Sequence, residues 1–239
     1  MGLFIGTSGW AYPEWGGVFY PRGLSRSRFL EHYATELTSC EINATFRRIQ
    51  TPEAIGRWAE AVPADFRFTA KAHRRLSYRK QLVATAEERA FVGEFLDSLA
   101  PLGDRLGGLM IQFPPFVERD AQGLDELLGL LPAGLRFACE FQNPSWDVWE
   151  VADRLAERGG TVSLREENGK APKELPVGPL AYLRLKGRYD DREREALAEL
   201  LTSEGRERDV YVFARHKDVP ADDPHTGLGL ARWLVARAG

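Results

Sequence analysis

The chain has 239 residues, 44% of them hydrophobic and 28% charged, which is the composition of a globular protein with room for one large core, and we expect a single domain over residues 1–239. No apolar run is long enough to span a membrane, and no basic segment followed by an apolar stretch marks a secretory signal, so the expected location is the cytoplasm. The formal net charge of −3 argues against a generally basic nucleic-acid-binding coat and leaves open one locally positive cleft.

Strand-like and helix-like patterns alternate from one end of the chain to the other, with no linker, internal repeat or low-complexity stretch. The strand-like runs lie at residues 3–6, 40–43, 66–72, 109–113, 137–141, 161–164, 182–186 and 210–213. Two of these runs contain the cysteines, Cys40 and Cys139, which we expect to be buried free thiols rather than a disulfide or metal ligands. Alternation of this kind is typical of a parallel sheet joined by crossover helices.

Several of the segments between the strands carry helix-start signals, namely a capping residue followed by proline or an acid. These signals are Thr51 followed by Pro52 and Glu53, Thr85 with Glu88, Ser145, and Asp223 followed by Pro224. Residues 165–179 differ, because they contain three prolines and little apolar periodicity. We therefore predict that one outer helix is reduced or missing between the sixth and seventh strands.

Eight strand-like runs with short helices in 239 residues match the size and order of a TIM-type (β/α)8 barrel, in which active sites form at the C-terminal ends of the strands. A doubly wound open sheet is the competing α/β architecture. An open sheet gathers its ligand at one switch point, whereas polar residues end most of the strands here. We predict the single-domain barrel.

Along these runs, charged and amide residues occupy alternate positions, so their side chains point to the same face of the sheet. Between Phe66 and His73, apolar residues alternate with Arg67, Thr69 and Lys71, so the two sets point to opposite faces of the sheet. Burying a charge without a partner costs about 3 kcal/mol or more. Converging charges therefore indicate an open, wet pocket or a ligand that completes it.

Cations outnumber acids in the predicted interior. Lys71, Arg184 and Lys186 face the carboxylates of Glu41 and Glu140, and the rim adds Arg165 and Arg215. A phosphate or carboxylate would balance the excess, and arginine offers bidentate geometry to such groups. We therefore expect a small anionic ligand; the alternative is that the cations pair with the two acids and only fill the barrel.

Other candidates lie at or after strand ends. Glu41, Glu140 and His73 are the candidate catalytic residues for proton transfer, although a cation beside either carboxylate should lower its pKa and favour an electrostatic or metal-binding role. His216 also follows a strand. The candidate ligand-binding residues are Trp10 as a ring-stacking surface, Asn43, Lys71, Gln112, Asn143, Arg184, Lys186 and Arg215. In the first loop we expect Trp15 to pack inward and Trp10 to face the ligand.

Motifs for common cofactor chemistry are absent from the sequence. It has no P-loop, no Gly-x-Gly-x-x-Gly after the first strand and no Gly-x-Ser-x-Gly elbow, which disfavours the usual nucleotide hydrolysis, nicotinamide and α/β-hydrolase mechanisms. The sequence specifies no cofactor. The inward cations outnumber the acids and imidazoles, which makes a metal site the less favoured alternative.

Several motifs resemble the signature of the YecE-like family, a domain of unknown function, in family order over nearly the whole chain. They are Ile5 to Trp10, Tyr12-Pro13, Trp15, Phe19 to Pro21, Glu41 to Phe46, Lys71 to Arg74, Gln112 to Pro115, Glu140-Phe141 with Pro144 to Trp146, and Tyr182 to Gly187. The resemblance implies a TIM-type barrel and no established reaction.

Departures from that signature cluster at the expected mouth of the barrel. Arg47 stands where the family usually has Tyr, Gln142 where it has Arg, and Lys186 where it has His, and residues 214–218 replace an Asn-Asn-Asp-like segment. These changes predict either an altered ligand or a lost activity.

The sequence thus favours an enzyme, or former enzyme, that binds a phosphate-bearing molecule at the barrel mouth, as a hydrolase of phosphoesters or as an isomerase or lyase in sugar-phosphate chemistry. Two alternatives stay open: a non-catalytic module that binds nucleic acid or protein, and a metal-dependent phosphodiesterase. The sequence does not specify the oligomeric state.

Overall fold

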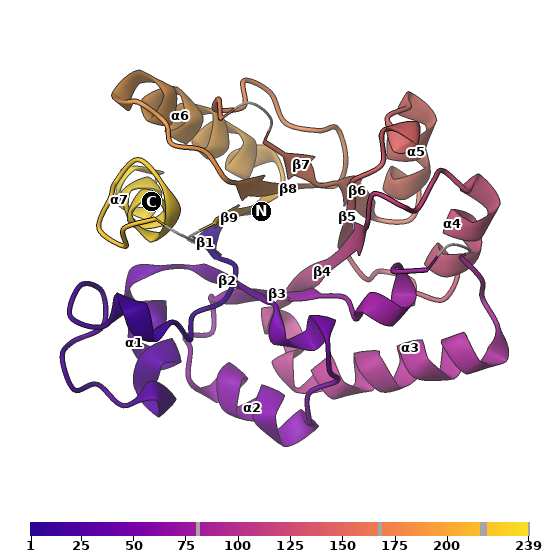
Figure 1. Cartoon of the computed structure of the whole chain (residues 1–239), viewed down its shortest axis with the longest axis horizontal. Helices are drawn as coiled ribbons and strands as arrows, with labels where there is room; N and C mark the ends of the chain where they lie inside the picture. Colours follow the sequence, from indigo (N-terminus) through magenta and orange to yellow (C-terminus); the bar gives the residue numbers. More distant parts are fainter. Residues whose placement is uncertain (80–81, 167–168, 216–218, 239) are drawn as a thin grey trace.

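Parallel strands form a ring at the centre of the molecule, and helices lie around its outside (Figure 1). The computed structural model describes residues 1–79, 82–166, 169–215 and 219–238. Within these residues the strands are β1 Leu3–Thr7, β2 Ser39–Ile42, β3 Arg67–Lys71, β4 Leu106–Phe113, β5 Phe137–Phe141, β6 Gly160–Val162, β7 Leu164–Arg165, β8 Leu180–Leu185 and β9 Asp209–Ala214. All neighbouring pairs are parallel, in the order β6-β5-β4-β3-β2-β1-β9-β8-β7.

The ring closes through one interrupted strand. β6 and β7 are separated only by Ser163, and β6 pairs with β5 while β7 pairs with β8. The Ser163 amide still donates to the Cys139 carbonyl of β5, at 2.8 Å. β6 and β7 therefore act as the single sixth strand of a TIM-type (β/α)8 barrel, as the sequence predicts.

The helices around the barrel are α1 Phe29–Glu36, α2 Pro52–Glu60, α3 Ala86–Leu99, α4 Ala121–Leu128, α5 Trp149–Ala156, α6 Asp191–Glu207 and α7 Gly227–Ala238. The described residues between β7 and β8 contain no helix, which confirms the expected missing crossover helix. Short 3-10 helices occupy Pro13–Trp15, Arg26–Arg28, Ala44–Phe46, Arg74–Leu76, Ala100–Arg105 and Pro144–Trp146.

The predicted helix starts are confirmed in part. Thr51 caps α2 and Thr85 caps α3, each through its side-chain oxygen. Glu88 does not complete a capping box with Thr85, in which its side chain would accept from the Thr85 amide, because its carboxylate binds Arg75 and Arg79 instead. Helices α5 and α7 begin a few residues after their predicted signals, at Trp149 and Gly227.

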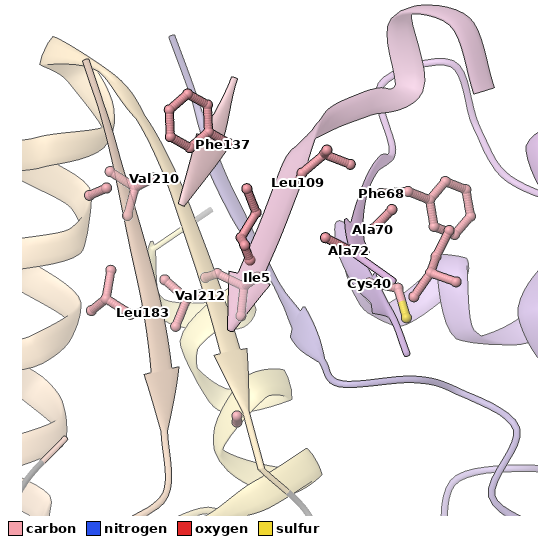
Figure 2. Close-up of a cluster of buried hydrophobic side chains, with 14 of the residues drawn as sticks. Ile5, Cys40, Phe68, Ala70, Ala72, Leu109, Phe137, Leu183, Val210 and Val212 are labelled. Atoms are coloured by element: carbon pink, nitrogen blue, oxygen red, sulfur yellow. The ribbon is translucent and has the colours of Figure 1, made fainter. Parts of the chain in front are cut away.

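Two apolar layers result from the alternating side chains. The larger layer lies between the strands and the helices; Figure 2 shows part of it, with Ile5, Phe68 and Val212 among the side chains from several strands. The smaller layer fills the lower barrel interior and comprises Met110, Ala138, Leu180, Tyr182, Tyr211 and Phe213, with Phe4 against it. Gly107 is required beside this layer, since a Cβ there would lie 2.4 Å from the Tyr211 hydroxyl. The apolar floor confines polar groups to the upper half of the barrel.

Both cysteines are buried and free, as predicted. Among the described residues, none of the helices is both long enough and apolar enough to cross a membrane.

Candidate functional site

A cavity of about 1140 Å³ opens at the C-terminal ends of the strands. Because all the strands are parallel, the residues at their downstream ends meet at this one end of the barrel. The predicted site residues that line the cavity are Asn43, Lys71, Gln112, Glu140, Arg184, Lys186 and Arg215. Side-chain alternation along several separate strands predicted that these residues point to the inside of the barrel, and they line one cavity.

Arg184 of β8 joins two carboxylates from opposite parts of the barrel. Its Nη1 donates to Glu140 Oε2 at 2.8 Å, and its Nη2 donates to Glu41 Oε1 at 3.2 Å. All three residues are buried, at 7%, 1% and 0% exposure for Arg184, Glu140 and Glu41. Each of these three buried charges therefore has a contacting counterion within the protein, and the two acids outnumber the single arginine.

Glu41 lies below the cavity rather than in its lining. Its carboxylate accepts hydrogen bonds from the Ser8 hydroxyl at 2.8 Å and the Tyr182 hydroxyl at 2.6 Å, besides the one from Arg184. Burial and the neighbouring Glu41 charge hold the pKa of Tyr182 well above its ordinary value, so the phenol keeps its proton and remains a donor. Glu41 is thus fully engaged by protein donors.

Glu140 is held in the ionised form. Burial by itself would raise its pKa, but the Arg184 charge and hydrogen bonds from Arg184, Gln142 and Gln112 outweigh burial and lower the pKa to about 2. The two amide donors lie 3.0 Å and 2.6 Å from Glu140 Oε1. A carboxylate in this state is a poor proton donor and a weak base at neutral pH.

Lys71 of β3 has different surroundings. Its Nζ donates to Gln112 Oε1 at 2.7 Å and lies 4.2 Å from the centre of the Phe46 ring. Among the described residues, no carboxylate lies within ion-pair distance, 4.0 Å, of this ammonium. The residue is only 9% exposed, yet it lines the cavity. A buried cation that lacks a contacting counterion faces open space.

These surroundings lower the pKa of Lys71. Burial is the largest cause, and the nearby Arg184 guanidinium lowers the pKa further. The more distant charges of Glu41 and Glu140 oppose these effects only partly, so the pKa is about 8 against 10.5 for ordinary lysine. Lys71 therefore titrates near physiological pH.

The positive charge of the cavity is distributed differently from the prediction. The two acids outnumber Arg184 and therefore also act on Lys71 from a distance, and the other charged residues of the lining are Lys186, Arg215 and Glu14. The side chain of Arg165 and the whole of His216 lie outside the described residues. The family departure at Gln142 lines the cavity, whereas Arg47 is exposed and does not.

The aromatic prediction for the first loop fails for Trp10 and holds for Trp15, which is buried against neighbouring rings. Trp10 packs against Trp58 and Phe68, with ring centres 5.1 Å and 6.3 Å away, and does not line the cavity. Tyr12 and Trp15 line it instead. The loop has no strand or helix periodicity, so the directions of these aromatic side chains are set by tertiary packing and could not be predicted from the sequence.

Two other predicted residues lie away from the cavity. His73 caps the short helix Arg74–Leu76, where its Nδ1 accepts from the Arg75 amide at 3.2 Å and its ring contacts Phe91. Asn143 caps the next loop by donating to the Pro115 carbonyl and accepting from the Ser145 amide. Both follow their strands by enough residues for the chain to turn outward.

Several site residues were missed by sequence reasoning. Tyr78 donates to the same Gln112 oxygen as Lys71, at 2.8 Å, and Ser8 holds Glu41. Neither residue has a sequence signal for its role, because each reaches its partner across the fold from a loop. Val219 and Pro220, beyond the last strand, complete one wall.

The described residues do not bring together three or more His, Cys, Asp or Glu side chains in a metal-binding group. The buried carboxylates of Glu41 and Glu140 already accept hydrogen bonds from Arg184 and other donors. The arrangement can bind an anion above Lys71 and can present a partly neutral amine to it.

The fold and the cavity together define a TIM-type barrel protein with a charged mouth. The sequence profile of the family described as "Protein of unknown function DUF72" matches residues 4–238. The chain belongs to this family, which confirms the resemblance to YecE-like proteins.

Relatives and solved structures agree with this assignment. The chain is 28% identical to UPF0759 protein YecE of Escherichia coli K12 over 158 residues, 66% of this chain and 54% of that protein, and 26% identical to UPF0759 protein YunF of Bacillus subtilis over 154 residues, 60% and 52%. The matched part thus spans about half the length of these relatives.

Solved structures share the fold over nearly the whole chain. A DUF72 family protein of Thermotoga maritima has a TM-score of 0.74 at 22% identity, with 98% of this chain and 97% of that chain covered. One from Enterococcus faecalis has a TM-score of 0.74 at 17% identity, with 99% and 95% covered. A D-psicose 3-epimerase, crystallised in the presence of D-fructose, has a TM-score of 0.52 at 12% identity, with 98% and 90% covered.

Proposed function

We propose that this protein is an enzyme that binds a small phosphate-bearing molecule in the mouth of the barrel and acts in sugar-phosphate chemistry. The site residues are Lys71 on the cavity floor and Lys186 and Arg215 nearer the rim. Asn43 and Gln142 add uncharged polar groups to the same lining.

The observation that carries the proposal is the position of Lys71. Its ammonium is buried against an amide oxygen and an aromatic ring, without a contacting carboxylate among the described residues, and it faces a cavity large enough for a metabolite. Leaving a buried charge in this state destabilises the protein, and an anionic ligand would remove the penalty.

Arg184 has one donor that the described residues leave unsatisfied. Its Nε is buried and lacks a hydrogen-bond partner within the part of the chain that the structure describes. Buried unsatisfied donors are uncommon in native proteins and indicate an acceptor that arrives with a ligand or water. This Nε is enclosed by protein atoms, so the phosphate proposal rests on the Lys71 ammonium, which faces the cavity.

Sugar-phosphate chemistry is better supported than phosphoester hydrolysis. Hydrolysis needs a strong base or a metal to activate water, whereas Glu140 is a weak base with a pKa of about 2. A metal-dependent phosphodiesterase is less well supported, since no group of metal ligands converges within the described residues. The inward packing of Trp10 also weakens the alternative of an aromatic surface for nucleic acid.

Thermal denaturation with a panel of anions tests the proposal. Inorganic phosphate, sulfate, sugar phosphates and nucleotides would each be added at equal ionic strength. We expect phosphate-bearing compounds to raise the Tm in a saturable way, because a ligand that binds only the folded state stabilises it by mass action. Native mass spectrometry of gently purified protein would detect a retained anion directly.

A matched pair of variants locates the binding. Lys71→Met should abolish the Tm shift, while Lys173→Met, which removes an exposed lysine outside the cavity, should retain it. Equal shifts in the two variants, or no shift of the unaltered protein by any phosphate compound, would contradict the proposal. Binding of a single-stranded oligonucleotide that persists in Glu140→Gln and falls steeply with salt would favour the nucleic-acid module instead.

A further inference from the structure

We infer that Lys71 is a nucleophile that forms an imine with the carbonyl carbon of its ligand, so that the substrate class is a phosphorylated aldehyde or ketone. The inference rests on the proposed function for the anionic group of the ligand. It adds a covalent role for the amine, which anion binding alone does not require.

The geometry around Nζ suits a nucleophile. Among the residues that the structure describes, the amine donates to one acceptor, Gln112 Oε1 at 2.7 Å, and the Phe46 ring covers one side of it at 4.2 Å. The remaining direction is the cavity, where the amine is part of the lining. Gln112 is itself fixed, because its other amide atom donates to Glu140 at 2.6 Å. A fixed acceptor orients the amine toward the space that a ligand carbonyl would occupy.

The electrostatics around the amine favour its neutral form. Of the charged groups facing it, Arg184 on β8 and Arg215 after β9 disfavour the ammonium, and Glu41 on β2 and Glu140 on β5 favour it from a distance. Burial and the cations dominate, so the pKa of Lys71 is about 8. At pH 7.5 such a lysine is neutral on the order of a hundred times more often than one with the ordinary value. Desolvation and an adjacent cation are a known means of activating a lysine for imine formation.

The covalent step balances without a further reactant. The nitrogen lone pair of neutral Lys71 attacks the carbonyl carbon, and the carbonyl oxygen takes up a proton to give a carbinolamine. A second proton then converts that hydroxyl into leaving water, and the C–O bond breaks as the C=N bond forms. From the ammonium, the net change is one carbonyl exchanged for one protonated imine and one water.

The two buried carboxylates near Lys71 suit the product of this step. The protonated imine keeps the single positive charge of the ammonium, so the field of Glu41 and Glu140 stabilises it as it does the lysine. Lys186 and Arg215 directly follow the last residues of β8 and β9, and they can hold a phosphate at the rim. A short molecule with a phosphate at one end and a carbonyl at the other spans these two parts of the cavity.

Reductive trapping tests the inference. The unaltered protein would be incubated with dihydroxyacetone phosphate or with dihydroxyacetone, each with sodium cyanoborohydride, and the modified peptide identified by mass spectrometry. We expect the adduct on Lys71, at least about tenfold above the labelling of Lys170, Lys173 and Lys186, because the neutral fraction sets the rate. The phosphorylated ketone should label at lower concentration than the uncharged one.

Variants separate a covalent role from an electrostatic one. Lys71→Arg keeps the positive charge but cannot form an imine, so trapping should disappear, whereas Lys173→Arg, an exposed position outside the cavity, should leave the trapping unchanged. Identification of the modified lysine in the unaltered protein does not depend on any variant, so it tests the inference even if Lys71→Arg does not fold.

Failure of this inference is distinguishable from failure of the proposed function. Labelling spread evenly over the lysines, or absent from Lys71 at a phosphate-ketone concentration that saturates the Tm shift, would overturn the imine and leave phosphate binding intact. Selective trapping of Lys71 by the uncharged ketone, without any Tm shift by phosphates, would support the imine and overturn the phosphate-bearing substrate.

Discussion

The two sides of the barrel mouth treat buried charge in opposite ways. On one side, Arg184 contacts both Glu41 and Glu140, so each of these buried charges has a counterion within the protein. On the other side, the contacts of Lys71 with the described residues are an amide oxygen and an aromatic ring, with no carboxylate in ion-pair contact. The comparison teaches that inward charge is not by itself a sign of a ligand site. A contacting counterion makes the charge part of the architecture, whereas its lack makes the charge available to a ligand.

Removing the shared cation should have the largest effect. Arg184→Met leaves Glu41 and Glu140 buried without their counterion, and we expect a loss of about 3–5 kcal/mol in the free energy of unfolding, measured by urea denaturation. Adding Glu140→Gln to this variant should restore part of the loss, since one uncompensated charge is removed. A loss below about 1 kcal/mol would show that the cluster is solvated and not architectural.

Removing the other cation should act in the opposite direction. Lys71→Met abolishes a buried charge whose pKa is about 8 rather than 10.5, a penalty of about 3 kcal/mol, while the lost hydrogen bond to Gln112 costs about 1 kcal/mol. We therefore expect the ligand-free variant to be more stable than the unaltered protein by about 1–3 kcal/mol at pH 7. Destabilisation by a similar amount would place Lys71 on the architectural side of the comparison.

The pH dependence sharpens this contrast. Because folding lowers the pKa of Lys71, the unfolded chain binds the proton more tightly between pH 8 and 10.5, and stability rises with pH in that window. The stability advantage of Lys71→Met should therefore be full below pH 8 and shrink as the pH rises toward 10.5. Buried Cys and Tyr groups titrate in both proteins, so the difference between two denaturation series isolates Lys71. A constant difference across the window would contradict the lowered pKa.

A change at the rim of the cavity should affect ligand binding without affecting the stability of the fold. Arg215 is exposed, and Arg215→Ala is expected to change the free energy of unfolding by no more than about 0.5 kcal/mol. Its loss should weaken binding of a phosphate compound by up to about tenfold and reduce the dependence on salt. Calorimetric titration at two ionic strengths measures both. Unchanged affinity would remove Arg215 from the site.

The smallest effect is expected at His73. It lies outside the cavity, where its Nδ1 accepts from the Arg75 amide. His73→Asn keeps an acceptor near that amide, and we expect phosphate affinity to stay within about twofold, which is about 0.4 kcal/mol. A large loss of affinity would mean that this loop contributes to the site in solution.

Much of the fold could be predicted because its signals are local. Strand parity, the cap at Thr51 and the prolines between the sixth and seventh strands each depend on neighbours in sequence, and each is confirmed. Parity also placed Lys71 and Arg184 inside the barrel, since alternation fixes direction once one face is buried.

The pairing of the site residues could not be predicted in the same way. Arg184 and Glu41 are 143 positions apart, and which acid a buried arginine contacts depends on barrel closure and strand stagger. The same holds for Glu88, which leaves its capping box for Arg75 and Arg79, and for Trp10, which turns into the core from a loop without periodicity.

The sequence by itself determined the barrel, its parallel strands and the set of polar residues that reach its mouth, because these follow from side-chain alternation over short stretches. Only the tertiary structure decided which charges are offset and which face the cavity. The reason is that an ion pair depends on distances of a few ångströms between strands far apart in the chain, and those distances are set by packing around the whole ring.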